Sequence, residues 1–197
     1  MTSPDVVFHT LVPIVEALEH LRVPYHISGS VASSKHGFGR STVDVDIVAD
    51  IRDEHVLPLV KLLDPNHYVD AAMIRNAILR RSSFNVVNLS TMLKVDVFIP
   101  KEGQFDRLGF TRAQLGIMPN TSSDRLFSYA SPEDTILRKL EWFRMGGGVS
   151  ERQWMDAIGV LKVQAKQLDY KYLWHWAHEL SLEDLLQQAL VDAGIEE

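Results

Sequence analysis

The stretch that decides the fold is HISGSVASSKHGFGRSTVDVDIVAD, residues 26–50. It holds a Gly-Ser pair, a short polar run, and then Asp44 and Asp46 inside an apolar segment. Residues two apart on a β-strand point to the same face, about 6.6 Å from each other, so the two carboxylates share one face of the strand. Carboxylates this close repel each other unless a cation compensates. The pair therefore predicts a metal site, with a half-exposed edge strand as the plain alternative.

A third carboxylate lies in a second apolar segment, KVDVFI, residues 94–99. If this segment is a strand beside the first, Asp96 stands within about 5 Å of Asp44 or Asp46. Hard oxygen ligands suit Mg²⁺, and two such ions about 3.5–4 Å apart are the usual arrangement for in-line phosphoryl transfer. We therefore expect Asp44, Asp46 and Asp96 to be metal ligands, with two Mg²⁺ ions when a nucleotide is bound.

Gly29 and Ser30 come between a short strand and a short helix, just before the Asp-Val-Asp segment. Glycine lets the backbone approach a ligand closely, and the free N–H groups at the start of a helix bind phosphate. The position of this pair predicts a phosphate contact beside the carboxylates.

Hydrophobic periodicity and turn residues give the remaining elements. Helices are expected at 4–22, 31–36, 53–63 and 71–80, strands at 25–27, 43–48, 67–70, 84–89 and 93–99, and no regular structure at 103–128. Four more helices are expected at 132–145, 151–165, 170–180 and 182–193, and capping boxes at Ser131 and Ser150 begin the first two. The predicted fold class is α+β. A small mixed sheet with flanking helices forms residues 1–125, N-terminal helix included, and a helical domain forms residues 126–197.

Composition narrows the function classes. The 197-residue chain has no cysteine, which excludes disulfides and thiolate catalysis. It has no apolar run of about 18 residues and no signal-peptide pattern, so we expect a cytoplasmic protein without a membrane partner. The net charge of −6 equals the six acids of residues 179–197, which hold no Lys or Arg. Residues 75–125 hold eight basic residues against four acids, an excess too small for a dedicated nucleic-acid stripe.

The segment GSVASSKHGFGRSTVDVDIV, residues 29–48, resembles the first motif of the nucleotidyltransferase superfamily, whose fold is shared with DNA polymerase β. In that superfamily a Gly-Ser or Gly-Gly precedes an Asp-x-Asp strand, and a third Asp lies on a neighbouring strand. The form that runs from Arg40 to Asp46 is similar to the abortive-infection nucleotidyltransferases, the toxins of type IV toxin–antitoxin systems. Residues 131–161, SPEDTILRKLEWFRMGGGVSERQWMDAIGVL, resemble the helical motif of the same group.

The resemblance implies roles for particular residues. Asp44 and Asp46 would hold metal and nucleotide phosphates, and Asp96 would be the general base. Lys139 would contact the triphosphate, and Asp156 would complete the site from the helical part. The implied nucleotide-binding residues are Gly29, Ser30, Arg40, Thr42 and Lys139. For Lys139 and Asp156, a structural salt bridge predicts the same spacing as a catalytic pair.

The resemblance also implies partners. The nucleotidyltransferase would move NMP from an NTP to an acceptor hydroxyl on RNA such as tRNA, on a protein or on a small molecule. An antitoxin or a second copy of the chain is the expected macromolecular partner. Two alternatives stay open: a nucleotide-binding regulatory protein of the same fold with little catalysis, and a small-molecule nucleotidyltransferase of the aminoglycoside or lincosamide kind.

Overall fold

A computed structural model describes residues 4–39 and 44–195. The chain forms two compact units, whose described residues are 4–31 with 44–129, and 32–39 with 130–195. The sequence prediction placed a single boundary after Arg125. The structure instead divides the chain after Tyr129, because residues 126–129 form a strand of the sheet, and it also assigns residues 32–39 to the second unit.

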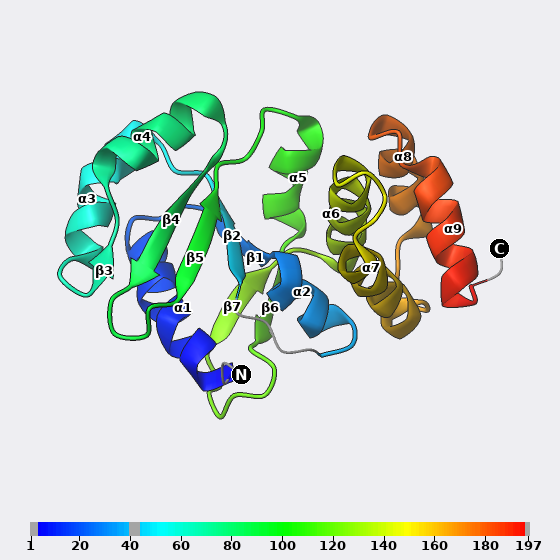
Figure 1. The fold of residues 1–197 in the computed structure, drawn as a ribbon, viewed down its shortest axis with the longest axis horizontal. Helices are drawn as coiled ribbons and strands as arrows, with labels where there is room; N and C mark the ends of the chain where they lie inside the picture. The colour runs from blue at the N-terminus through cyan, green and yellow to red at the C-terminus, as the bar shows by residue number, and fades with distance from the viewer. Residues whose placement is uncertain (1–3, 40–43, 196–197) are drawn as a thin grey trace. The chain divides into compact units, whose positions relative to one another are not determined.

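The first unit is built on a mixed sheet, which has seven strands among the described residues (Figure 1). The strands are β1 (Tyr25–Ser28), β2 (Val45–Ala49), β3 (His67–Tyr68), β4 (Ser83–Asn88), β5 (Lys94–Phe98), β6 (Gln114–Ile117) and β7 (Leu126–Tyr129). Their order is β3-β4-β5-β2-β1-β7-β6. The β2–β5 and β1–β7 pairs are parallel and the other pairs are antiparallel.

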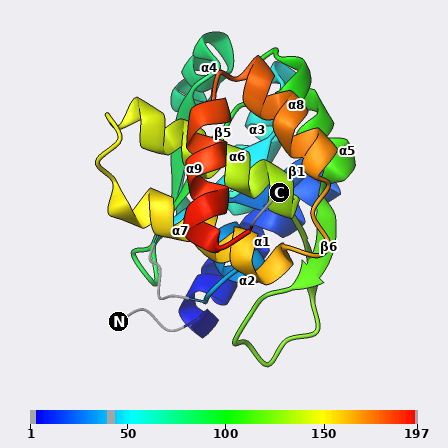
Figure 2. The same ribbon diagram turned by 90° about the vertical axis from the view of Figure 1, so that its right-hand side faces the viewer.

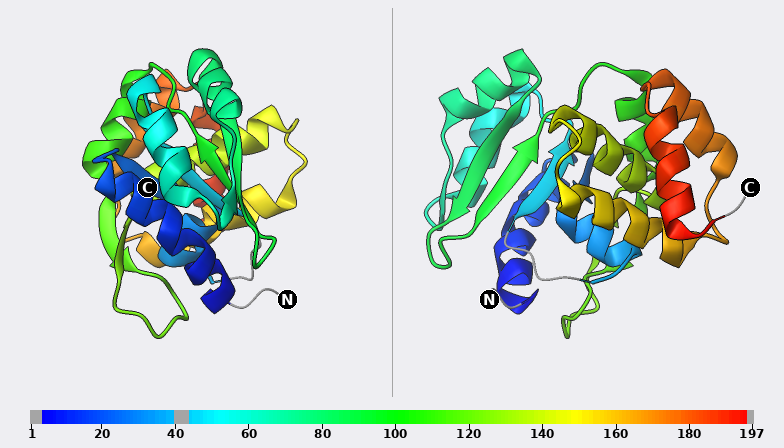
Figure 3. Two further views of the ribbon diagram at one scale, coloured as in Figure 1. Left: turned by 90° about the vertical axis from the view of Figure 1, so that its left-hand side faces the viewer. Right: turned by 45° about the vertical axis from the view of Figure 1, so that its right-hand side comes forward.

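One face of the sheet is apolar and forms the core of the first unit. Val45, Ile47 and Ala49 of β2 are fully buried on this face, and the residues between them are half-buried. Helices α1 (Pro4–His20), α3 (Asp53–Leu63) and α4 (Ala71–Arg80) form one layer at this side of the sheet, with α3 next to both of the others (Figure 3). The opposite face of β2 carries Asp46, so the alternation predicted for this strand is confirmed.

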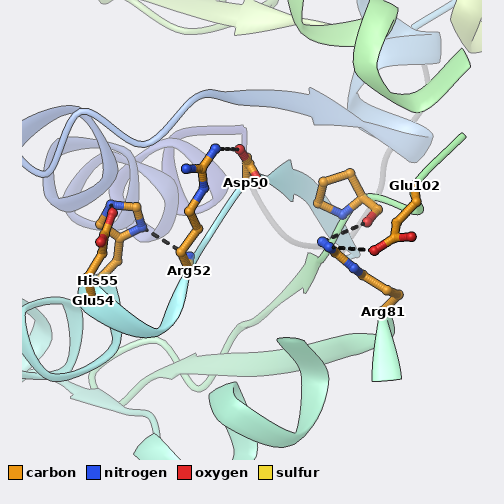
Figure 4. Close-up of polar contacts among 7 residues, drawn as sticks. Asp50, Arg52, Glu54, His55, Arg81 and Glu102 are labelled. Carbon is orange, nitrogen blue, oxygen red and sulfur yellow. Dashed lines mark hydrogen bonds and ion pairs between the residues drawn. The ribbon is translucent and has the colours of Figure 1, made fainter. Parts of the chain in front are cut away.

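Polar contacts fix the ends of α3 and α4 (Figure 4). The ring of His55 accepts a hydrogen bond from the backbone N–H of Arg52 at 3.0 Å, and the Arg52 side chain pairs with Asp50 at 3.1 Å. At the end of α4, Arg81 adopts a left-handed backbone conformation. Its side chain donates to Glu102 at 3.1 Å and to the carbonyl of Pro100 at 3.5 Å, which fastens the segment after β5.

The second unit is helical. Helices α6 (Pro132–Met145), α7 (Glu151–Gln164), α8 (Tyr170–Glu179) and α9 (Glu183–Ala193) pack side by side (Figure 2). Each contributes a fully buried leucine to a shared core: Leu140, Leu161, Leu173 and Leu186. Most of α2 (Gly29–His36) belongs to this unit, where the ring of His36 is buried and its Nε2 lies 2.8 Å from the carbonyl oxygen of Ala130.

The α+β fold class is confirmed, and α3, α4 and α6 have the predicted bounds. The prediction for residues 103–128 was wrong, since this segment forms α5 (Gln104–Arg112), β6 and most of β7. The Ser131 cap is confirmed, because its hydroxyl accepts from the Asp134 N–H at 3.1 Å, whereas Ser150 makes no side-chain cap. None of the helices in the described ranges has both the length and the apolarity that crossing a bilayer requires.

Candidate functional site

A row of polar residues crosses four strands on the face of the sheet opposite the core. Strand register pairs Ser28 of β1 with Asp46 of β2, Asp46 with Asp96 of β5, and Asp96 with Asn85 of β4. Directly paired residues share a face and have Cβ atoms about 4.5–5.5 Å apart. The structure therefore brings Asp46 and Asp96 together as neighbours, as the expected adjacency of the two strands required. We call these four residues the carboxylate row.

Gly29 lies directly against the Asp46 side chain of the carboxylate row. It has a φ of +59°, in the left-handed region that favours glycine. A Cβ at this position would lie 1.8 Å from Oδ2 of Asp46 and 2.7 Å from its Cγ. The Asp46 carboxylate thus rests against the first residue of α2, where the positive end of the helix dipole favours an anion. Both the backbone conformation and this close approach require glycine at position 29.

Lys94 belongs to the site although the sequence interpretation gave it no role. Its Nζ lies 2.8 Å from Oδ2 of Asp96, two residues further along the same face of β5. This contact with Asp96 raises the pKa of the Lys94 ammonium, and the negative charges of Asp96, Asp44 and Asp46 add to the effect. The period-two argument that paired Asp44 with Asp46 could have found Lys94, since it applies equally to Lys94 and Asp96.

Asp44 lies one residue before β2, so it is adjacent to the strand rather than part of it. Its side chain is half-buried, and its charge acts on Lys94. Within the described residues, no group of three or more His, Asp or Glu side chains is close enough together to hold a metal ion. Asp44, Asp46 and Asp96 therefore do not form a preformed three-ligand metal site.

The donor set nevertheless fits Mg²⁺. This ion is usually bound through one or two carboxylates and completes its shell with water and substrate phosphates. Asp46 and Asp96, paired in register, supply two carboxylates on one face of the sheet. The chemistry of the site therefore matches an ion that is bound together with a nucleotide.

The structure describes some of the predicted nucleotide-binding residues and not others. Gly29 and Ser30 form the start of α2 beside Asp46, and Ser30 is buried. Arg40 and Thr42 lie outside the described residues. Their predicted contacts with nucleotide stay predictions.

Lys139 and Asp156 form a pair inside the second unit, as helical periodicity suggested. Lys139 Nζ lies 2.7 Å from Asp156 Oδ2, and the two side chains are only 4% and 8% exposed. Helices α6 and α7 hold them in contact. Because a buried structural ion pair accounts for this geometry, the triphosphate contact of Lys139 and the catalytic role of Asp156 stay predictions. The five predicted catalytic residues are thus divided, three in the first unit and two in the second.

No protein-family model matches the chain, and no curated protein matches its sequence. Solved structures match its fold. The solution structure of the antibiotic-resistance factor ANT(2'')-Ia aligns over 92% of this chain and 92% of its own, with a TM-score of 0.51 and 14% identity. The crystal structure of an antigenic nucleotidyltransferase-like protein from Paracoccidioides brasiliensis aligns over 91% of this chain and 90% of its own, with a TM-score of 0.50 and 15% identity.

The lincomycin-bound crystal structure of the lincosamide antibiotic adenylyltransferase LnuA aligns over 78% of this chain and 95% of its own, at 16% identity. Its TM-score is 0.46. At such identities a structural likeness establishes the fold and not the activity. The mixed sheet and its flanking helices therefore have the fold of the nucleotidyltransferase-like proteins.

Proposed function

We propose that this protein is a nucleotidyltransferase that moves NMP from an NTP to an acceptor hydroxyl. The observation that carries the proposal is the register of Asp46 with Asp96 beside Gly29, on a fold shared with nucleotidyltransferase-like structures. Two carboxylates on one face of a sheet are costly without a bound cation. A half-exposed edge strand, the plain alternative, does not fit β2, which has β1 on one side and β5 on the other.

The chain's own residues would divide the work in the following way. Asp44 and Asp46 would hold the metal that accompanies the nucleotide phosphates. The start of α2, with Gly29 and Ser30, offers backbone N–H groups to a phosphate. Asp96 accepts the proton of the acceptor hydroxyl as that oxygen bonds to the α-phosphorus, and the bond to the bridging oxygen breaks so that pyrophosphate leaves.

Mg²⁺ bound by Asp44, Asp46 and Asp96 would supply charge neutralisation for the phosphates in the transition state. Two ions are expected with NTP bound. Asp96 acts as the base only when its carboxylate is free of Lys94, which pairs with it in the nucleotide-free structure.

Label transfer tests the function. The purified protein is incubated with Mg²⁺ and each α-³²P NTP in turn, with total tRNA, with a panel of aminoglycosides and lincosamides, or with neither. We expect label on one acceptor class, which Asp46→Asn and Asp96→Asn abolish and EDTA prevents. Asp50→Asn is the matched control, because Asp50 directly follows β2 and its carboxylate pairs with the exposed Arg52.

The identity of the labelled acceptor distinguishes the toxin-type enzyme, the drug-modifying enzyme and the nucleotide-binding regulatory protein. Label on RNA supports the toxin-type prediction, and label on a drug supports the small-molecule alternative. Mg-NTP binding that depends on Asp46, with no labelled acceptor and no pyrophosphate released, would favour the nucleotide-binding regulatory protein. Full turnover in Asp46→Asn would refute the proposed site.

A further inference from the structure

We propose that the Lys94 ammonium is the counter-ion of the carboxylate row in the metal-free protein, and that a divalent metal displaces it from Asp96. The inference rests on the proposed function, because it concerns the same carboxylates. It adds a residue whose charge opposes the metal and thereby sets how tightly the nucleotide-free protein binds it.

The geometry of Lys94 supports this role. Its Nζ lies 2.8 Å from the Asp96 carboxylate, and the charges of Asp44 and Asp46 act on the same ammonium. Register pairs Val45 with Val95, and these are the residues that directly follow Asp44 and Lys94. The ammonium therefore pairs with a carboxylate of β5 and lies within the field of the two carboxylates at and just before the start of β2.

Exposure shows that Lys94 can leave. Its side chain is 47% exposed, whereas that of Asp96 is 20% exposed. A lysine side chain is a flexible four-carbon stem with a strongly hydrated head, so the half-exposed Lys94 can exchange its contact with Asp96 for water at little cost. Asp96 has no such freedom, because β5 lies between β2 and β4.

The positive charge of Lys94 should weaken metal binding at the carboxylate row. The ammonium and a divalent ion compete for the same carboxylate oxygens and repel each other when both are near. Coulomb's law in a water-like dielectric gives about a tenfold change in affinity for a monovalent and a divalent cation roughly 6 Å apart. Removing the charge of Lys94 should therefore tighten metal binding by about this factor.

The first experiment measures Mn²⁺ binding to the nucleotide-free protein by electron paramagnetic resonance of the free ion. Lys94→Gln should bind Mn²⁺ about tenfold more tightly than the wild type, and Lys94→Arg should not bind it more tightly. Lys61→Gln is the matched control, since it removes the same charge from an exposed position on α3, at the apolar side of the sheet. Asp46→Asn reports on the metal site itself.

Thermal unfolding provides a readout that a merely structural lysine would not give. Without metal, Lys94→Gln should unfold at a lower temperature than the wild type, because its carboxylates repel each other uncompensated. Saturating Mn²⁺ should abolish this difference. A loss of Tm that persists unchanged with Mn²⁺ would overturn the inference.

The displacement of Lys94 can also be measured in the wild-type protein, so that the result does not depend on whether a variant folds. Amine acetylation, followed by mass spectrometry, should label Lys94 faster when Mn²⁺ is bound, and Lys61 at an unchanged rate. Unchanged Lys94 reactivity under Mn²⁺ that binds through Asp46 refutes the displacement and leaves the proposed function standing. If Asp46→Asn leaves Mn²⁺ binding unaltered, the metal site fails and this inference fails with it.

Discussion

The substitution Gly29→Ala tests the geometry of the site directly. A non-glycine residue in the left-handed region costs about 1–2 kcal/mol, and alanine recovers about 0.4–1 kcal/mol by restricting the unfolded chain. The new Cβ would also meet Asp46 at 1.8 Å from Oδ2, 2.7 Å from Cγ and 3.0 Å from Cβ. Rotation about χ1 moves the first two atoms away and leaves the third in place.

Because Asp46 Cβ cannot rotate away, the β1–β2 pair must open slightly, and such overpacking costs about 1–3 kcal/mol. The sum is a loss of about 1–5 kcal/mol in the free energy of unfolding of the first unit. Gly147→Ala is the matched control, since Gly147 has a φ of +75° and nothing within 4 Å of its added Cβ. It should show the backbone cost alone.

The assay must report on the unit that carries each change. All four tryptophans, at positions 142, 154, 174 and 176, lie in the second unit, so their fluorescence follows Gly147→Ala and misses Gly29→Ala. Hydrogen exchange of the β1 and β2 peptides reports the first unit. In an Asp46→Gly background, which removes the Cβ that cannot rotate away, Gly29→Ala should cost about 1–2 kcal/mol less, a coupling expected for residues in contact. A Gly29→Ala cost no larger than that of Gly147→Ala, with no coupling to Asp46, would refute the close approach.

Three further predictions concern the second unit and are checked by tryptophan-detected urea unfolding. Lys139→Met should cost about 3–5 kcal/mol, because Asp156 stays buried without its charged partner, and Lys139→Met with Asp156→Leu should cost much less. Burial lowers the pKa of His36, against the opposing effect of its Ala130 contact, so the unit should lose stability as pH falls below 6.5; His36→Gln should flatten that dependence. Tyr172→Phe should cost about 1–3 kcal/mol, because it removes the hydroxyl that donates to the buried Asp134 at 2.7 Å.

Helix bounds could be predicted where the capping chemistry is local. The side chain of Asp70 accepts from the Met73 N–H at 2.9 Å, and Ser131 does the same for Asp134, so α4 and α6 begin where the sequence indicates. Ser150 has the same residue pattern and forms no cap. A pattern of capping residues thus shows that a cap can form, and the surrounding chain decides whether it does.

The elements within residues 103–128 could not be predicted, because their buried residues do not recur with the spacing of a helix or a strand. Helix α5 buries only Phe105 and Gly109, which gives no apolar stripe. Strand β6 exposes three of its four residues, since it is the edge of the sheet and pairs only with β7. Elements that depend on a partner distant in sequence leave little local signal.

In the candidate site too, features set by neighbouring residues could be predicted, and features set by the sheet order could not. Alternation along each segment placed Asp46 and Asp96 on strand faces, and this needed no knowledge of the fold. Their meeting depends on the sheet order, which puts β5 beside β2 in parallel although α3, β3, α4 and β4 intervene in the chain. The role of Gly29 depends on that order too, because β1 must pair with β2 before a side chain at position 29 can collide with Asp46.

Lys94 shows why a proposed metal site should be interpreted together with the structure of its metal-free state. Clustered carboxylates destabilise a fold until a cation arrives, so a chain that must fold before it binds nucleotide gains from a cation of its own. A buried lysine would hold that position permanently, whereas Lys94 is half-exposed and so can be displaced. Its ion pair with Asp96 is therefore compatible with catalysis only if the pair opens. The proposed function implies that the carboxylate row is stabilised by Lys94 before nucleotide binds and by metal afterwards. The affinity of the site for metal would then equal the free energy gained from the metal less that lost when Lys94 is displaced.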